Sequence, residues 1–157
     1  AADVITYVEH GVCDMGVVGK DTIMENGKQF YEILDLGFGK CSFSLAAPKE
    51  SVSNFYVGYN SKVIASKYPN VTRRFFSSKD MDVRIIKIEG SVELAPLLNL
   101  SDAIVDIVET GSTLKENGLE VIEKIADISA RLIVNSASMK IRKKEVEMIA
   151  KKLSDVI

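Results

Sequence analysis

The stretch AIVDIVETGSTLKENG, Ala103 to Gly118, decides the fold. Its first six residues are almost continuously apolar, which is typical of a strand covered on both faces of a sheet. The polar residues that follow, with Gly111 among them, predict a short turn, and a helix is expected to begin near Leu114. A buried strand that leads through a turn into a helix is the repeating unit of α/β proteins.

Outward from this stretch, strand-like and helix-like segments alternate along the chain. Strands are expected in residues 13–21, in two runs within 31–48, and at 83–88, 103–108 and 130–135. Helices are expected at 3–10, in two pieces within 61–76, after Ser91 as a capping residue, and in the C-terminal tail. The pattern predicts an α/β fold with largely parallel sheets and flanking helices.

Composition and charge exclude two classes of partner. The 157 residues carry a formal net charge of -2 with a pI near 5.5, which argues against a nucleic-acid partner because such proteins bind phosphates with a positive field. The longest apolar stretches are strand-sized and interrupted by charges, so no membrane partner is expected. We therefore expect a cytoplasmic protein.

The cysteines and the single histidine indicate no catalytic or metal centre. Cys13 and Cys41 lie far apart without a second cysteine or histidine at ligand spacing, so both are expected to be reduced and buried. His10 follows a helix-like stretch and precedes Gly11, which favours a hydrogen bond at a helix end over a catalytic role.

The loop after the central strand is the candidate site. Asp106 interrupts a buried strand, where a carboxylate is costly unless it has a partner. The backbone N–H groups and hydroxyls of Thr110–Thr113, with Gly111 free to adopt positive φ, can line a cradle for a phosphate monoester. Asp106 and Glu109 fit better beside the phosphate, against sugar hydroxyls or water around Mg²⁺. The alternative is that the hydroxyl residues only cap and form turns.

The segment ELAPLLNLSDAIVDIVETGSTLKENGL, Glu93 to Leu119, resembles the signature region of the ATP phosphoribosyltransferase family. Other segments resemble this family in the same order: TYVEHG at 6–11, DMGVVGKD at 14–21, LDLGFGKC at 34–41, YPNVTRRFF at 68–76 and ADISARLIVNSAS at 126–138. The resemblance covers essentially the whole chain. It differs at Asn99, where the family commonly has glycine and where asparagine tolerates a left-handed turn, and at Ile5, where proline is common.

The resemblance implies a two-lobed fold like the type II periplasmic binding proteins, with the active site in the cleft between lobes. Lobe I would comprise 1–42 and 128–157, and lobe II 43–127. The residues expected to bind the 5-phosphate of phosphoribosyl pyrophosphate are Thr110, Gly111, Ser112 and Thr113. Those expected to be catalytic are Asp106 and Glu93, with Glu109 as a further substrate-binding residue. Those expected to form tight turns under the substrates are Gly16, Gly19 and Gly39, with ordinary turn geometry as the alternative.

The implied reaction joins N1 of the ATP adenine to the anomeric carbon of phosphoribosyl pyrophosphate and releases pyrophosphate, with Mg²⁺ as cofactor, in the first step of histidine biosynthesis. Little chain follows residue 135, so the resemblance is to the family's short form, which works with a subunit similar to histidyl-tRNA synthetase in a hetero-oligomer. The family's N-terminal strand and basic loop are expected to be missing from this chain. Two alternatives stay open: a non-catalytic two-lobed binding module, and an inactive fragment that keeps one substrate half-site.

Overall fold

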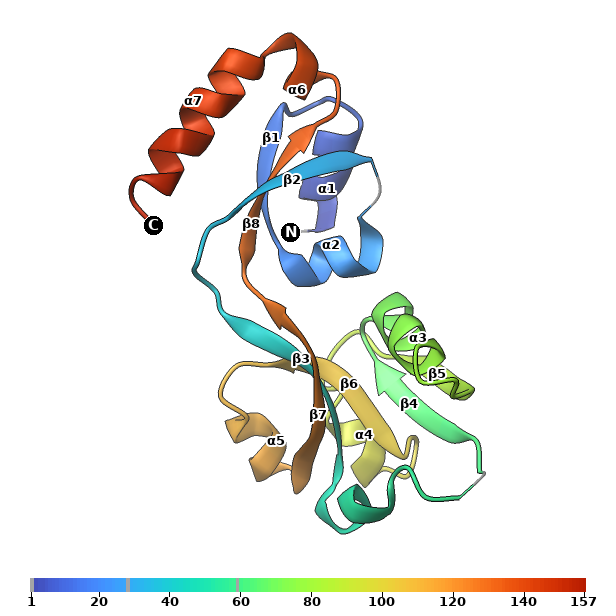
Figure 1. The fold of residues 1–157 in the computed structure, drawn as a ribbon. Helices are drawn as coiled ribbons and strands as arrows, with labels where there is room; N and C mark the ends of the chain where they lie inside the picture. The colour runs from blue at the N-terminus through green and yellow to red at the C-terminus, as the bar shows by residue number, and fades with distance from the viewer. Residues whose placement is uncertain (1, 28, 59) are drawn as a thin grey trace. The chain divides into compact units, whose positions relative to one another are not determined.

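The chain forms two units, in each of which strands are flanked by helices (Figure 1). The computed structural model describes residues 2–27, 29–58 and 60–157. The first unit comprises Ala1–Lys40 and Ile128–Ile157, and the second comprises Cys41–Asp127. The sequence placed residues 41 and 42 in the first lobe, but they belong to a strand whose partner lies in the second unit, with Ser42 opposite Val108. No described helix is long and apolar enough to cross a membrane.

The first unit is built on a sheet with the strand order β1-β8-β2. Its elements are α1 (Ala2–Glu9), β1 (Met15–Gly19), α2 (Lys20–Asn26), β2 (Phe30–Asp35), β8 (Ala130–Asn135), α6 (Ser138–Ile141) and α7 (Lys143–Ser154). The central strand β8 is antiparallel to both neighbours. Helix α1 packs on β1 through a cluster that includes Ile5 and Val8, which fixes one face of the sheet.

The second unit is built on a sheet with the strand order β5-β4-β6-β3-β7. Its elements are β3 (Cys41–Pro48), the 3-10 helix η1 (Lys49–Asn54), β4 (Lys62–Ser66), α3 (Pro69–Ser77), β5 (Val83–Lys87), α4 (Leu94–Leu97), β6 (Ala103–Val108), α5 (Ser112–Glu116) and β7 (Leu119–Ile128). Strand β4 is parallel to β5 and to β6, whereas β3 is antiparallel to β6. The predicted central strand at 103–108 is confirmed as β6.

The α/β class is confirmed, but the prediction of largely parallel sheets is wrong. A parallel pair needs a crossover, and parallel pairing among the described strands is confined to β4, which pairs with β5 through the crossover helix α3 and also pairs with β6. Strand β8 follows β7 after a single residue and enters the first unit between β1 and β2, antiparallel to both. Because β1 and β2 thus pair with β8 and not with each other, the first sheet has no parallel pair among the described strands.

Two local predictions are also wrong. The first half of 61–76 is the strand β4 and not a helix, because it hydrogen-bonds to strands on both sides and buries Ile64 and Ala65 between them. Ser91 does not cap α4, since its φ is +50° and the helix starts later, with Glu93 at the N-cap position. The predicted left-handed turn at Asn99 is confirmed by a φ of +54°.

The cysteine prediction is corrected in part. Both cysteines are free thiols, as expected, but Cys13 is exposed and Cys41 is only half-buried. Cys13 lies in the turn between α1 and β1, and Cys41 starts β3 beside the chain's passage between the two units. Neither residue sits in the sheet interior, where side chains of the middle of β3 are buried.

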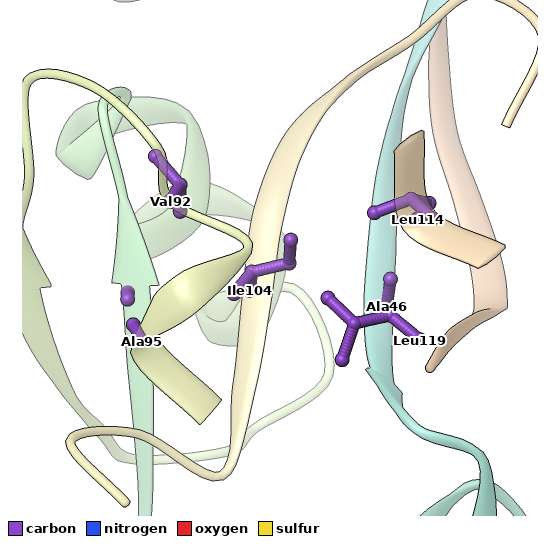
Figure 2. Close-up of a cluster of buried hydrophobic side chains, with 7 residues drawn as sticks. Ala46, Val92, Ala95, Ile104, Leu114 and Leu119 are labelled. Atoms are coloured by element: carbon purple, nitrogen blue, oxygen red, sulfur yellow. The ribbon is translucent and has the colours of Figure 1, made fainter. Parts of the chain in front are cut away.

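A row of small and apolar side chains crosses one face of the second sheet and anchors two short helices on it. The row consists of Ala46, Ile104 and Ala65. With the side chains that pack against it, it forms one buried cluster, here called the core row: Ala46, Ala65, Val92, Ala95, Ile104, Leu114 and Leu119 (Figure 2). Ile104 lies opposite Ala65 on one side and Ala46 on the other. Helices α4 and α5 therefore share one face, on either side of the end of β6.

Candidate active site

A pocket of about 430 Å³ lies at the carboxyl end of β6, entirely within the second unit. It is lined by Glu93 and by the continuous stretch Asp106–Leu114. In open α/β sheets, ligands bind at the carboxyl ends of the parallel strands, and β4, β5 and β6 end on this side. The position therefore favours a binding site.

Asp106 reaches the pocket because of its place in the strand. Side chains alternate along a strand, so Asp106 is on the same face as Ile104, where α4 and α5 pack. Its register partner on β3 is Ser44, which is buried. One carboxylate oxygen, Oδ1, accepts a hydrogen bond of 2.8 Å from the Ile107 backbone N–H.

The electrostatics of Asp106 are those of a partly desolvated carboxylate. Burial raises the pKa of Asp106, and the hydrogen bond from the Ile107 N–H opposes this rise. The nearby Glu93 carboxylate raises the pKa further, and the Lys67 ammonium lowers it. The carboxylates of Glu93, Asp106 and Glu109 thus line one pocket, and none of them forms an ion pair with another described side chain.

In the loop after β6 the hydroxyl side chains are exposed to solvent, and the C-terminal end of the loop is anchored in the core by Leu114. Gly111 has a φ of +75°, a conformation that costs little only for glycine, and it is the N-cap residue of α5. The Thr110 and Ser112 hydroxyl oxygens lie 2.9 Å apart, within hydrogen-bonding distance. Thr113 is exposed, whereas Leu114 is buried in the core row and holds the loop against the sheet.

The structure brings the second-unit site predictions together in one pocket: Glu93, Asp106, Glu109, Thr110, Gly111, Ser112 and Thr113. The helix expected near Leu114 begins at Ser112 and is five residues long. The turn interpretation of the hydroxyls holds for the pair formed by Thr110 and Ser112, and it is compatible with a binding role because both side chains remain exposed.

The three predicted glycines lie in the first unit, and one was misinterpreted. Gly16 is not in a tight turn: it lies in β1, where a Cβ atom would come within 2.7 Å of Val4 Cγ1, so glycine is needed for α1 to pack on the strand. Gly19 ends β1 and caps α2 with a φ of -69°, which any residue adopts. Gly39 does lie in a turn, with a φ of +62° and open space around it.

Lys67 is a cation close to the pocket that the sequence interpretation did not consider. It directly follows β4, next to the position of Asp106 on β6. The prediction of a helix over this segment hid the signal, because a cation that follows a strand is meaningful only once the strand is recognised. Recognising VIAS as a parallel strand would have placed Lys67 at the same sheet edge as Asp106.

Comparisons with known proteins agree on one family. The family model described as ATP phosphoribosyltransferase (HisG) matches residues 1–155. The ATP phosphoribosyltransferase of Clostridium kluyveri is 67% identical over 153 residues, which are 98% of this chain and 69% of that protein. The protein of the same name from Clostridium acetobutylicum is 61% identical over 159 residues, with 100% of this chain and 72% of that protein covered.

Solved structures support both the fold and the family. A chain of the ATP phosphoribosyl transferase (HisG:HisZ) complex from Thermotoga maritima matches with a TM-score of 0.87 and 41% identity, covering 99% of this chain and 75% of that one. Holo ArgBP from T. maritima matches with a TM-score of 0.62 over 99% of this chain and 69% of that one, but at 12% identity this shows the fold alone. The expected periplasmic-binding-protein-like α/β fold is thereby confirmed, and the chain belongs to the ATP phosphoribosyltransferase family.

Proposed function

We propose that this chain transfers the phosphoribosyl group of phosphoribosyl pyrophosphate to N1 of ATP, as the first step of histidine biosynthesis. The adenine N1 lone pair forms the new bond to the anomeric carbon, and the electrons of the broken carbon–oxygen bond leave with pyrophosphate. The observation that carries the proposal is that one pocket is lined both by the hydroxyl-bearing loop and by the carboxylates of Glu93 and Asp106. Family membership fixes the reaction class, and the pocket supplies matching chemistry.

The loop from Thr110 to Thr113 is the proposed site of the 5-phosphate. Its hydroxyls and the backbone N–H groups at the start of α5 are neutral donors that can surround a phosphate monoester. The buried anchor at Leu114 means that little ordering is needed when the ligand binds.

Asp106 and Glu93 are the proposed catalytic residues, with Glu109 at the rim as a substrate-binding residue. Two carboxylates accept hydrogen bonds from ribose hydroxyls, which anchor the sugar. Departure of pyrophosphate leaves positive charge on the ribose ring, and preorganised negative charge beside the ring stabilises that transition state. No protein nucleophile is required, because the adenine N1 itself attacks the anomeric carbon.

Mg²⁺ fits this site as an ion carried partly by the substrate. Among the described residues no group of three or more histidine, cysteine, aspartate or glutamate side chains could hold a metal ion. Mg²⁺ is commonly bound through one or two carboxylates plus substrate phosphates, and Asp106 and Glu93 offer two carboxylates. When bound, the ion would neutralise charge on the leaving pyrophosphate.

A partner subunit follows from the solved relative. The chain of the HisG:HisZ complex that resembles this one was solved with its HisZ partner. We propose that this chain likewise works in a hetero-oligomer with a HisZ-type regulatory subunit, similar to histidyl-tRNA synthetase. Gly19 and Gly39 remain proposed backbone contacts for the substrates in the first unit, whereas the packing of Gly16 under α1 accounts for that residue.

The test is pyrophosphate release from ATP and phosphoribosyl pyrophosphate with Mg²⁺, with and without a HisZ-type subunit, together with mass identification of the N1-phosphoribosyl product. The wild-type chain should form this product, and Asp106→Asn should not. Asp127→Asn, which changes an exposed carboxylate paired with Lys124, is the matched control and should retain activity. Binding of phosphoribosyl pyrophosphate without product under all conditions would select the binding-only alternative.

A further inference from the structure

Lys67 is held at the edge of the pocket by its neighbours. The preceding residue, Ser66, is fully buried and pairs with Val105 in parallel register, so Lys67 comes next to Asp106. The Ser66 hydroxyl donates to the Val105 carbonyl at 2.6 Å and accepts from the Tyr68 backbone N–H at 2.9 Å. The Ser66 carbonyl accepts from the Ile88 N–H at 3.1 Å. The backbone that carries Lys67 is thus fixed on both sides.

When the alternation of β4 is continued by one residue past its end at Ser66, Lys67 falls on the same face as the pocket. Ala65 is in the core row beside Ile104, so the second residue after Ala65 is on the face that Asp106 shares with Ile104. The Lys67 ammonium lowers the pKa of Asp106 and of Glu89, in agreement with the position that the register gives it. Within the described part of the chain, the Lys67 side chain forms no ion pair or hydrogen bond.

The lining of the pocket is negatively charged, so an anionic ligand would need a cation nearby. The lining contains Glu93, Asp106 and Glu109 and no lysine or arginine. A ligand with several negative charges would be repelled from this lining unless a cation at the rim offsets the carboxylates. Lys67 is the described cation that the strand register places beside Asp106.

We propose that Lys67 binds the pyrophosphate group of phosphoribosyl pyrophosphate, on the side of the ribose away from the hydroxyl loop. The inference rests on the proposed function. In the strand order, β4 lies on one side of β6, and α5 leads from β6 to β7 on the other side. With the 5-phosphate on the loop and the ribose beside Asp106, the pyrophosphate is directed toward β4. A cation there also stabilises the charge that develops on the leaving group.

The experiment compares two ligands by calorimetry, phosphoribosyl pyrophosphate with Mg²⁺ and ribose 5-phosphate, which lacks the pyrophosphate. Lys67→Met should weaken binding of phosphoribosyl pyrophosphate by about 10- to 100-fold and change ribose 5-phosphate binding by less than about threefold. Lys67→Arg should stay within about fivefold of wild type for both ligands because it keeps the charge. Lys49→Met, an exposed lysine beyond the opposite end of β3, is the control and should change neither affinity.

Three results would overturn the inference. Unchanged binding of phosphoribosyl pyrophosphate by Lys67→Met would remove Lys67 from the site. An equal loss for both ligands would assign Lys67 to the 5-phosphate and contradict its assignment to the pyrophosphate. A wild-type chain that binds neither ligand would reject the proposed function together with this inference. Thermal unfolding of each variant separates a lost contact from a lost fold.

Discussion

Two aspartates in strands, one in each unit, show how the same side chain can either have its partners within the fold or lack them. Asp35 ends β2, and its Oδ1 accepts hydrogen bonds from the Gly37 N–H at 3.0 Å and the Ser129 hydroxyl at 2.7 Å, while its Oδ2 lies 2.9 Å from Arg131. These hydrogen bonds and the Arg131 charge lower the pKa of Asp35. Asp106 has one backbone hydrogen bond, and burial raises its pKa.

The difference indicates which carboxylate is available to interact with a ligand. Asp35 has its partners within the fold, so it fixes the start of the passage from β2 and leaves little capacity for a ligand. Asp106 lies in a pocket with no ion-pair partner among the described residues, so its charge costs stability that a bound substrate can offset. Departures from full pairing of charged groups are expected at functional sites, and Asp106 is such a departure.

The largest effect expected is on ligand affinity when Asp106 is neutralised. Asp106→Asn keeps the size of the side chain but removes a charged hydrogen-bond acceptor for the ribose, which should weaken phosphoribosyl pyrophosphate binding by about 2 to 3 kcal/mol. The matched change Asp35→Asn should leave that affinity unchanged. Calorimetric titration of both variants checks the comparison, and equal losses would erase the distinction between the two aspartates.

One glycine in each unit, Gly16 in the first and Gly111 in the second, should likewise differ in whether its substitution affects packing or ligand binding. Gly16→Ala places a methyl group 2.7 Å from Val4 Cγ1 and 2.9 Å from Val8 Cγ2, so overpacking should lower the free energy of unfolding by about 1 to 3 kcal/mol. Gly111→Ala meets nothing nearer than Val108 Cγ1 at 3.8 Å and pays only for its left-handed backbone, about 1 to 2 kcal/mol.

Chemical denaturation measures both glycine effects, and ligand titration separates them further. Gly111→Ala should also weaken binding because it disturbs the loop, whereas Gly16→Ala should affect binding only through stability. A tighter-binding Gly111→Ala variant, or a Gly16→Ala variant as stable as wild type, would show that the glycine roles are assigned incorrectly.

A smaller effect is expected for a single loop hydroxyl. Thr113→Val removes one donor to the 5-phosphate at nearly constant volume, and the neighbouring hydroxyls keep part of the interaction, so affinity should fall by about 1 kcal/mol. Thr22→Val, which removes a hydroxyl next to Asp21 in the first unit, is the control. Identical affinities for the two variants in calorimetry would exclude Thr113 from the phosphate contact.

The smallest effects concern stability, and they should have opposite pH dependence. The folded pKa of Asp35 is lowered, so its stabilising contribution is present above its unfolded value near 3.8 and is lost as the pH falls through the folded pKa. The folded pKa of Asp106 is raised, so its contribution is favourable below 3.8 and is lost as the pH rises through the folded pKa.

Unfolding measurements across pH test these signs. Asp35→Asn should destabilise the protein at pH 7 and approach wild-type stability in acid. Asp106→Asn should be at least as stable as wild type at pH 7 because it removes the cost of a buried charge. The same pH trend for both variants would contradict the contrast drawn from their surroundings.

The sequence predicted what is local and missed what depends on pairing. AIVDIV identified a buried strand, and Asp106 stood out because a carboxylate in such a strand is costly. The hydroxyl residues and Gly111 likewise identified the turn, because the tendency of these residue types to form turns depends only on their own short segment. These predictions needed no knowledge of neighbouring strands.

The rest depended on long-range contacts. Residues 62–66 form a strand because β5 and β6 flank them, and their apolar pattern alone suits a helix equally well. Gly16 serves the packing of α1, which no turn signal could reveal. Lys67 gains meaning only from the parallel register that places it beside Asp106. The antiparallel position of β8 likewise depends on the chain's return to the first unit.

The most direct test of the central claim is an amide NMR titration of the chain with ribose 5-phosphate. The largest chemical-shift changes should occur at Thr110 to Thr113 and at Ile107, whose N–H donates to Asp106, while Gly37 and Ser129 around Asp35 should stay unchanged. Shifts confined to the surroundings of Asp35, or binding without any change in the loop, would contradict the placement of the phosphoribosyl site in the second unit.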